Sequence, residues 1–231
     1  MPRAALLLLL LLAVCGHAQP PELPAAAPPP PVDAVSSPDW EADMRRFAAE
    51  DAARPPPRGA VLFVGSSSIR MWDLDAAFPE LATVNRGFGG SQLRDATWYA
   101  DRIILPYAPR TIVLYAGDND LEAGRTPHQV REDFRAFVQR VRRGLPHARI
   151  VCLSIKPSPA RAHLLQAVHA ANVLLRQEAA RWDRVEFVDV AAPMLDGGGQ
   201  PRRELFLEDG LHLNAAGYAL WRRLLLPHLR P

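Results

Sequence analysis

The chain has 231 residues, of which 48% are hydrophobic and 23% charged, so it is long enough to bury a sizeable core in one globular domain. Its formal net charge is +2 at pH 7, and it falls to +1 if an N-terminal segment carrying Arg3 is removed. This balance excludes the basic excess that binds nucleic acid or anionic membrane surfaces. We therefore expect no nucleic-acid partner.

The first 18 residues have the order of a secretory signal peptide. Arg3 precedes an apolar run, residues 4–14, that is too short to span a bilayer. Gly16 and Ala18 are small residues before the bond to Gln19, where we expect cleavage. The alternative is lipid attachment at Cys15, which is less favoured because the bulky Val14 precedes it. We expect an exported protein, periplasmic or secreted, with no stable membrane insertion after cleavage.

The composition then changes twice along the chain. We expect residues 1–18 to be the signal peptide, 19–38 a disordered linker rich in proline and alanine, and 39–231 the folded domain. After cleavage only Cys152 remains, so no intramolecular disulfide can form. Cys152 lies in an apolar run and is predicted to be a small buried residue.

In the folded domain, short apolar runs alternate with amphipathic ones. A first helix is predicted to begin at Asp39 as its N-cap and to end near Ala53, and a last helix to begin at a cap on Asn214. Strands are predicted at 60–64, 82–85, 111–115, 150–155 and 185–189. Two further helices are indicated by apolar residues at helical spacing: Val130, Phe134, Phe137, Val138 and Val141, and then Leu164, Val168, Leu175 and Trp182. Alternating strands and helices predict an α/β protein with a parallel sheet covered on both faces.

Four polar clusters stand where ligands collect in such a sheet, beyond the carboxyl ends of strands and before the last helix. They are residues 65–70, 85–91, 117–120 and 209–212. A serine hydroxyl becomes a nucleophile at neutral pH when an imidazole takes its proton, and a carboxylate fixes the tautomer of that imidazole. The clusters contain several serines, a histidine at position 212 and carboxylates that include Asp209, so all three kinds of group are present.

Taken together and in this order, the four clusters resemble the SGNH or GDSL hydrolase superfamily, with a particular likeness to the catalytic subunits of intracellular platelet-activating-factor acetylhydrolase and their bacterial relatives. The resemblance covers about residues 58–230 and includes the segment 213–218 after the histidine. It implies a three-layer α/β/α, flavodoxin-like fold with a parallel sheet of about five strands. It also implies chemistry that needs no cofactor.

The resemblance assigns roles to single residues. Ser67 is the expected nucleophile, and Asp209 and His212 are its expected base relay. The expected oxyanion-hole donors are the backbone amides of Ser67 and Gly90 and the side-chain amide of Asn119. The sequence departs from the family at Ser66, where an aspartate is usual, and whether Ser66 replaces the hydrogen bond of that aspartate is left open.

Each cluster also has a simpler interpretation. A serine run after a strand is often only a turn, and glycines often only allow a tight loop. The segment 118–122 looks like part of a calcium loop, but Ala123 and Gln129 stand where such a loop needs glycine and glutamate. Asp209 and His212 could be metal ligands, but no further histidine or cysteine cluster supports this.

The sequence therefore predicts an exported serine esterase that hydrolyses short-chain acyl esters, acetyl esters first, through an acyl-serine intermediate. The expected substrate is a small-molecule or carbohydrate ester. The alternatives are a lysophospholipase-like or thioesterase-like acylhydrolase, or a non-catalytic binding protein on the same fold, which the departure at Ser66 motivates. The oligomeric state has no signal in the sequence.

Overall fold

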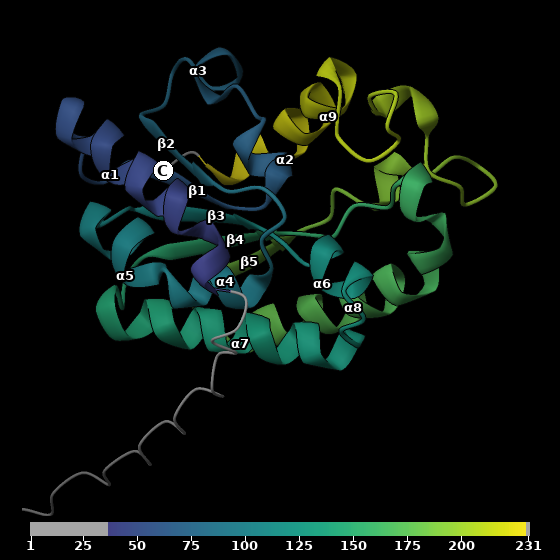
Figure 1. Ribbon diagram of the computed structural model, residues 1–231. Helices are drawn as coiled ribbons and strands as arrows, with labels where there is room; N and C mark the ends of the chain where they lie inside the picture. The colour runs from purple at the N-terminus through teal and green to yellow at the C-terminus, as the bar shows by residue number, and fades with distance from the viewer. Residues whose placement is uncertain (1–36, 230–231) are drawn as a thin grey trace, which may run out of the picture.

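The computed structural model describes residues 37–229, which form a parallel sheet with helices on both faces (Figure 1). The sheet has five strands in the order β2-β1-β3-β4-β5, and every neighbouring pair is parallel. The strands are β1 (Val61–Gly65), β2 (Thr83–Gly87), β3 (Thr111–Tyr115), β4 (Arg149–Leu153) and β5 (Val185–Val188). This order is the flavodoxin-like one, which confirms the predicted fold class.

All five predicted strands are present. β2 ends two residues later than predicted, at Gly87, and β4 ends two residues earlier, at Leu153, although the apolar run continues to Ile155. The reason is a side chain from a helix. The side chain of Asn172 accepts a hydrogen bond from the backbone N–H of Ile155 at 2.8 Å and donates one to the Ile155 carbonyl at 2.9 Å. Both ladder groups of Ile155 are thereby occupied, so the strand cannot continue.

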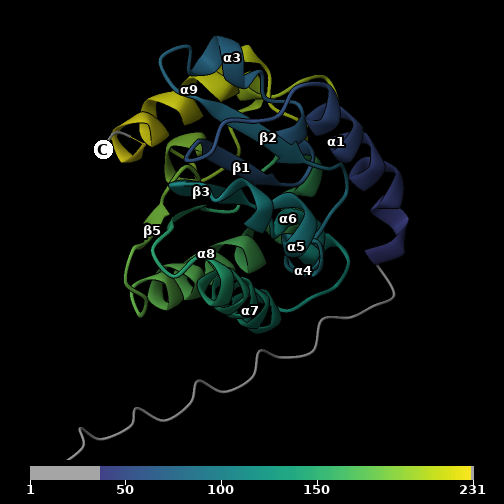
Figure 2. The same cartoon turned by 90° about the vertical axis from the view of Figure 1, so that its left-hand side faces the viewer.

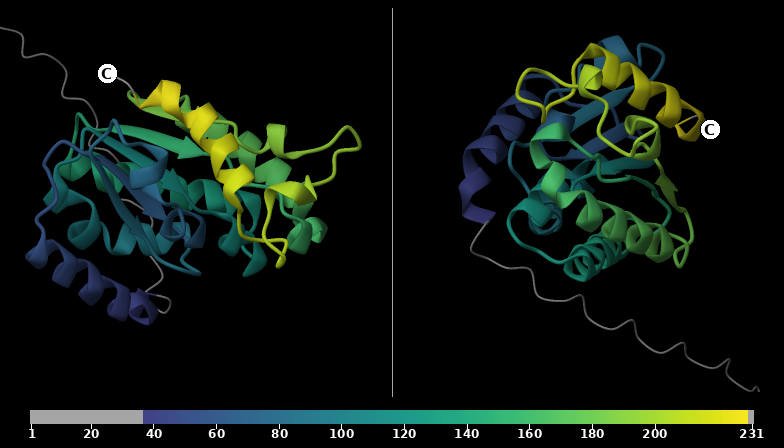
Figure 3. Two further views of the ribbon diagram at one scale, coloured as in Figure 1. Left: turned by 90° about the horizontal axis from the view of Figure 1, so that it is seen from above. Right: turned by 90° about the vertical axis from the view of Figure 1, so that its right-hand side faces the viewer.

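Helices pack on the two faces of the sheet, as Figures 1 and 2 show from two directions. The lower face in these views is covered by α4 (Leu93–Trp98), α5 (Ala100–Ile103), α7 (Pro127–Gly144) and α8 (Leu165–Ala179). The helix α1 (Glu41–Ala53) lies beside the β2 edge of the sheet (Figure 2) and buries Met44 and Phe47 in the same core. The upper face is covered by α2 (Ser67–Arg70), α3 (Leu74–Ala77) and α9 (Ala215–Leu225). Figure 3 shows α9 lying across the sheet. The short α6 (Asp118–Glu122) follows β3.

Each face of the sheet has its own hydrophobic core. The five apolar residues predicted to share one side of α7 are all buried in the lower core. The upper core is rich in aromatic rings: Trp221 lies 4.7 Å from Tyr115 and 5.8 Å from Trp72 between ring centroids. Burial of such large rings is a main source of stability in a chain whose described part has no disulfide, since Cys152 is free.

The beginning of the first helix differs from the prediction. A 3₁₀ turn, Ser37–Trp40, precedes α1, and the N-cap is Trp40 rather than Asp39. The indole N–H of Trp40 donates to the carbonyl of Gly89 at 2.7 Å, so a tertiary contact sets the start of this helix. The cap at Asn214 is confirmed, because its side chain accepts hydrogen bonds from the backbone amides of Ala216 and Gly217.

Three further predictions concern Cys152, membrane-spanning helices and the N-terminal segments. Cys152 is buried, and burial raises the pKa of its thiol to about 12, as expected for a small core residue. Within residues 37–229, none of the helices is long and apolar enough to cross a bilayer. The predicted signal peptide, and the predicted linker up to residue 36, lie outside the described residues and stay predictions.

Candidate active site

Ser67 stands at the carboxyl end of β1, an inner strand that lies between β2 and β3. All five residues of β1 are buried, and the strand ends at Gly65 with a φ of +148°. Any Cβ at Gly65 would collide with the carbonyl oxygen of Tyr115 on β3, so only glycine fits. The chain turns there from strand to helix, and Ser67, half-buried, is the first residue of α2.

The structure brings Ser67, His212 and Asp209 together although Ser67 and His212 are 145 residues apart. The distance from His212 Nε2 to Ser67 Oγ is 3.0 Å, and the distance from His212 Nδ1 to Asp209 Oδ2 is 2.6 Å. An ionised carboxylate only accepts, so His212 Nδ1 carries the hydrogen and donates it to Asp209. His212 Nε2 is then free of hydrogen and accepts from the Ser67 hydroxyl.

Asp209 holds its own turn together as well as the imidazole. Its Oδ1 atom accepts hydrogen bonds from the backbone amides of Leu211 at 2.8 Å and His212 at 3.0 Å. The hydrogen bond from the His212 side chain and these two backbone donors lower the pKa of Asp209 to about 2. The carboxylate is therefore charged throughout the neutral range, as its contact with the imidazole requires.

The turn of Asp209 and His212 is fixed from two sides. Gly210 has a φ of +64°, a conformation that favours glycine, and its carbonyl accepts a hydrogen bond from the backbone of Ala160 at 3.1 Å. On the other side, the backbone N–H of Leu207 donates to the carbonyl of His212 at 2.8 Å. Both contacts are to backbone atoms, so the position of the imidazole does not depend on packing of His212 alone.

A contact between α9 and α2 keeps the histidine and the serine in register. The Tyr218 hydroxyl donates to the carbonyl of Ser68 at 3.0 Å, and the Tyr218 ring stacks on Trp72 with centroids 5.4 Å apart. His212 precedes α9 by a few residues, and Ser68 follows the predicted nucleophile directly. This role of Tyr218 was not predicted from the sequence, and its place in the segment after the histidine was the signal that could have found it.

The glycine-rich loop after β2 lies against the same end of β1. The Phe88 amide and the Ser91 hydroxyl both donate to the carbonyl of Gly65, at 2.9 and 3.3 Å. Gly90 is exposed with a φ of +78°, and no heavy atom lies within 4 Å of the position that a Cβ would take. The backbone of Gly90 is thus open to an approaching ligand.

Asn119, on α6, is joined to this loop by its side chain. Its Nδ2 atom donates to the Ser91 carbonyl at 3.0 Å, and its Oδ1 atom accepts from Arg161 at 3.1 Å. Asn119 is half-buried. The structure therefore brings the second, third and fourth polar clusters to the carboxyl end of the sheet beside the first, as the sequence predicted.

Ser66 does not replace the hydrogen bond of the aspartate that the family resemblance led us to expect at its position. Its side chain is completely buried, and its Oγ atom has no hydrogen-bond partner among residues 37–229. Its backbone carbonyl accepts from the amides of Ile69 and Arg70 and so helps to form α2. The contact between Ser67 and His212 is present without a carboxylate at this position.

A cluster of charged residues that was not predicted from the sequence lies behind Asn119. Lys156 and Arg161 both approach the Asp118 carboxylate, at 2.6 and 3.3 Å. Both follow β4, so their place after a parallel strand was a signal that could have found them. Within residues 37–229, no group of three or more histidine, cysteine, aspartate or glutamate side chains could hold a metal ion.

Comparisons with known proteins agree with this geometry. Residues 64–220 match the family model of the GDSL-like Lipase/Acylhydrolase family. The chain is 28% identical over 187 residues to platelet-activating factor acetylhydrolase IB subunit alpha1 of Pongo abelii, with 78% of each chain covered.

Two solved structures show the same fold. A Streptococcus pneumonia protein named as a platelet activating factor has a TM-score of 0.74 and 27% identity, over 83% of this chain and 92% of its own. An acetylxylan esterase from Geobacillus stearothermophilus has a TM-score of 0.60 and 17% identity, over 74% of this chain and 94% of its own. The chain therefore belongs to the GDSL-like lipase/acylhydrolase family of the SGNH superfamily and is a serine hydrolase of carboxylic esters.

Proposed function

We propose that this protein is an exported esterase that removes short acyl groups, acetyl first, through an acyl-serine intermediate on Ser67. One observation carries the mechanism: an unbroken chain of hydrogen bonds runs from Ser67 through His212 to Asp209, with contacts of 3.0 and 2.6 Å. The imidazole of His212 can therefore accept the proton of the Ser67 hydroxyl when that oxygen attacks an ester.

In the first half of the reaction, Ser67 Oγ attacks the ester carbonyl carbon while its proton moves to His212 Nε2. The carbonyl π pair moves to the oxygen, which becomes an oxyanion in a tetrahedral intermediate. When the intermediate collapses, the bond to the alcohol oxygen breaks and His212 returns the proton to that oxygen. Asp209 stabilises the imidazolium formed in between, because its carboxylate stays charged.

In the second half, His212 takes a proton from water, and the hydroxide oxygen that results attacks the acyl-serine carbonyl carbon. Collapse of this second intermediate releases the carboxylic acid and returns the proton to Ser67. The oxyanion of both intermediates would accept hydrogen bonds from the backbone amides of Ser67 and Gly90 and from Asn119 Nδ2. Gly90 suits this role because the space around its backbone is open.

Two observations support a short acyl group. The relatives are named for acetyl hydrolysis, one as a platelet-activating factor acetylhydrolase and one as an acetylxylan esterase. A long acyl chain needs a deep apolar channel at the nucleophile. Three cavities of the described part, of about 550, 500 and 420 Å³, are lined by other residues, so none of these three offers such a channel to Ser67 or His212.

The first test is hydrolysis of p-nitrophenyl esters from acetate to octanoate. We expect the highest kcat/KM on acetate and a steady fall as the acyl chain grows. Ser67→Ala and His212→Ala should each lower kcat by at least about 1,000-fold, because each removes a member of one proton-transfer unit. The matched control is Ser66→Ala, which removes a buried hydroxyl without a partner and should keep near wild-type activity.

Two outcomes would contradict parts of this proposal. Full activity of Ser67→Ala would reject the nucleophile, and a preference for octanoate would favour the lysophospholipase-like alternative. Acetylated xylo-oligosaccharides and a short-chain acyl lipid, compared at equal concentration, would then show which alcohol carries the acyl group.

Export is proposed from the N-terminal sequence alone, with its apolar run and its small residues before Gln19. The full chain is expressed in a bacterial host, the cells are fractionated, and the mature N-terminus is sequenced. We expect esterase activity outside the cytoplasm and a first residue of Gln19. A lipidated Cys15 as the first residue would replace the free N-terminus by a membrane anchor.

A further inference from the structure

The side-chain amide of Asn119 is held in one orientation by two opposite partners. Arg161 Nη2 donates to Asn119 Oδ1 at 3.1 Å, and Asn119 Nδ2 donates to the Ser91 carbonyl at 3.0 Å. A guanidinium only donates and a backbone carbonyl only accepts, so flipping the amide would break both contacts. One hydrogen of Nδ2 is used by Ser91, and the second is left for a ligand.

Arg161 is itself fixed by charge and by burial. Its side chain is 15% exposed, its Nη1 atom lies 3.3 Å from Asp118 Oδ2, and its Nε atom lies 3.6 Å from Glu122 Oε2. Its guanidinium therefore faces two carboxylates and one amide at once. Such a planar fork of donors loses little freedom when it makes several contacts together.

The cluster holds one cation more than Asp118 requires. Lys156 is nearly fully buried, donates to Asp118 Oδ2 at 2.6 Å, and also donates to the Tyr115 hydroxyl at 3.1 Å. Burial alone would raise the pKa of Asp118, but Lys156 and Arg161 outweigh it and hold that pKa below its usual value. Lys156 can neutralise Asp118 by itself, and Arg161, which is shared between Asp118 and Glu122, also places its Nη2 atom against the Asn119 amide oxygen.

A cation that donates a hydrogen bond to the amide oxygen makes the N–H groups of the same amide stronger donors. Hydrogen bonds in a chain polarise one another, and the effect is larger in a partly buried site than in water. Arg161 pulls electron density toward Oδ1 and makes the free Nδ2 hydrogen more positive. That hydrogen is the one proposed to meet the oxyanion.

The segment that carries Arg161 also touches the other half of the site. Arg161 lies in a 3₁₀ segment, Pro159–Leu164, and has non-helical backbone angles. The residue before it, Ala160, donates its backbone N–H to the Gly210 carbonyl in the turn between Asp209 and His212. The same short segment therefore braces the amide donor and the base.

We infer that Arg161 is a positioning residue of the oxyanion hole, which orients and polarises the Asn119 amide and acts on the reaction only through it. The inference rests on the proposed function, because it assumes that Asn119 donates to the oxyanion. Arg161 touches no reacting atom in this scheme. Its effect should therefore appear in the transition state and not in substrate binding.

The test is a double-mutant cycle with Asn119→Ala, Arg161→Met and both together, measured on p-nitrophenyl acetate. Loss of one oxyanion donor typically lowers kcat by about 100- to 1,000-fold, which we expect for Asn119→Ala. Arg161→Met should lower kcat by about tenfold or more, with KM changed less than about threefold. In the Asn119→Ala background, Arg161→Met should change kcat by less than about threefold.

Each other result has one meaning. If the two losses multiply, or if Arg161→Met keeps full activity while Asn119→Ala loses it, the role of Arg161 is overturned and the oxyanion assignment stands. If Asn119→Ala keeps full activity, the oxyanion assignment of the proposed function fails, and the inference fails with it. Rise of KM with unchanged kcat would make Arg161 a substrate-binding residue and would also overturn the inference.

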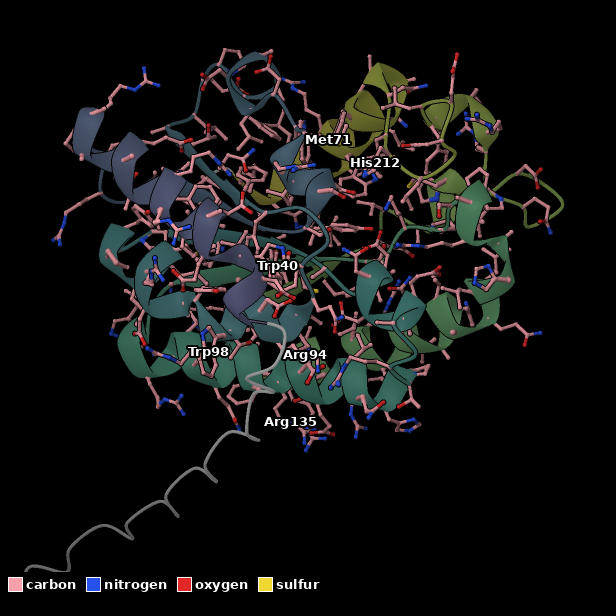
Figure 4. All side chains as sticks on the ribbon, viewed as in Figure 1. Trp40, Met71, Arg94, Trp98, Arg135 and His212 are labelled. Carbon is pink, nitrogen blue, oxygen red and sulfur yellow. The ribbon has the colours of Figure 1, made fainter. Side chains whose placement is uncertain are left out.

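The matched control is Arg135→Met. Arg135 also pairs with a buried carboxylate, Glu178, at 2.7 Å, and Figure 4 shows Arg135 at the edge of the molecule opposite to His212. Arg135→Met should lower the melting temperature without changing kcat. Arg161→Lys keeps the cation and should recover part of the rate lost in Arg161→Met, and no recovery would overturn the role of the charge. If Arg161→Met does not fold, Arg161→Gln, which also removes the cation, takes its place in the cycle.

Discussion

The two oxygens of Asp209 have separate partners, and this separation explains how so short a segment can orient a base. Oδ1 accepts from two backbone amides of the turn, while Oδ2 accepts from His212 Nδ1. The same carboxylate therefore closes the turn and orients the imidazole. A spacing of three residues suffices because the turn, and not a helix or strand, sets the distance.

Gly90 offers a test at the scale of one residue. Alanine has room there, but a φ of +78° costs an L-residue about 1 kcal/mol, so Gly90→Ala should lower the melting temperature slightly. We expect kcat/KM on p-nitrophenyl acetate to fall by about tenfold or more, because the new methyl group blocks the approach of the carbonyl to an oxyanion donor.

The matched control for Gly90→Ala is Gly59→Ala. Gly59 has a φ of +73° and equally open surroundings, but it lies at the amino end of β1, at the opposite edge of the sheet. The two variants should melt at similar temperatures, and only Gly90→Ala should lose activity. Equal activity in both would remove Gly90 from the proposed oxyanion hole.

At the scale of elements, short helices at the carboxyl end of the sheet are connected by side chains that bond to backbone. The Asp120 carboxylate of α6 accepts the amide of Leu93 at the start of α4, and Asn119 of α6 donates to the carbonyl of Ser91. Both bonds join α6 to the loop that carries Gly90. The loop after β2 thus takes its place from the helix after β3.

Asp120 makes this connection dependent on pH. The side chain is completely buried, its Oδ2 atom has no hydrogen-bond partner among residues 37–229, and burial raises its pKa to about 7. An unfolded aspartate has a pKa of about 3.9, so between about pH 4 and pH 7 the folded chain holds a proton that the unfolded chain has lost. The free energy of unfolding therefore falls as pH rises through this window.

Asp120→Asn should remove this pH dependence while keeping an oxygen for the Leu93 amide. We expect the melting temperature of the variant, relative to wild type, to rise from about pH 5 to about pH 8. Asp75→Asn, on the exposed part of α3, is the control and should show no such trend. A constant difference between Asp120→Asn and wild type across this range would show that Asp120 does not hold the proton.

At the scale of the whole molecule, the two helical layers of the protein differ in their relation to the site. The upper layer contains α2, which begins with Ser67, and α9, which follows His212 (Figures 1 and 3). Two residues of α9 hold this layer together: Tyr218 bonds to α2, and Trp221 lies in the upper core. The lower layer, with α7 and α8, has the larger core and contains neither of these side chains. Loosening the upper layer should therefore disturb the contact between Ser67 and His212.

Trp221→Phe and Phe137→Leu test this division, because both residues are fully buried, one in each layer. Each substitution should lower the free energy of unfolding by about 1 to 2 kcal/mol. Well below the melting temperature, only Trp221→Phe should lower kcat, measured together with thermal unfolding by circular dichroism. Equal losses of kcat in both variants would mean that the two layers affect the site alike.

Several features of the protein were determined locally and could be predicted. The five strands and α7 follow from apolar periodicity, and the cap of α9 follows from Asn214, because these patterns depend on neighbours within a few residues. The five candidate site residues were assigned through the resemblance of the four polar clusters to the family. The parallel direction of the strands places those clusters at one edge of the sheet, as the alternation of strands and helices predicted.

Tertiary structure alone decided the rest, since each remaining feature depends on atoms far apart in sequence. Trp40 replaced Asp39 as the cap of α1 through its bond to Gly89, 49 residues away, and Asn172 ended β4 by occupying Ile155. Arg161 meets Asn119 across 42 residues, so no local pattern could reveal their contact. The amino-acid sequence by itself determined the elements and the reactive groups, and packing decided which side chains hold those groups in place.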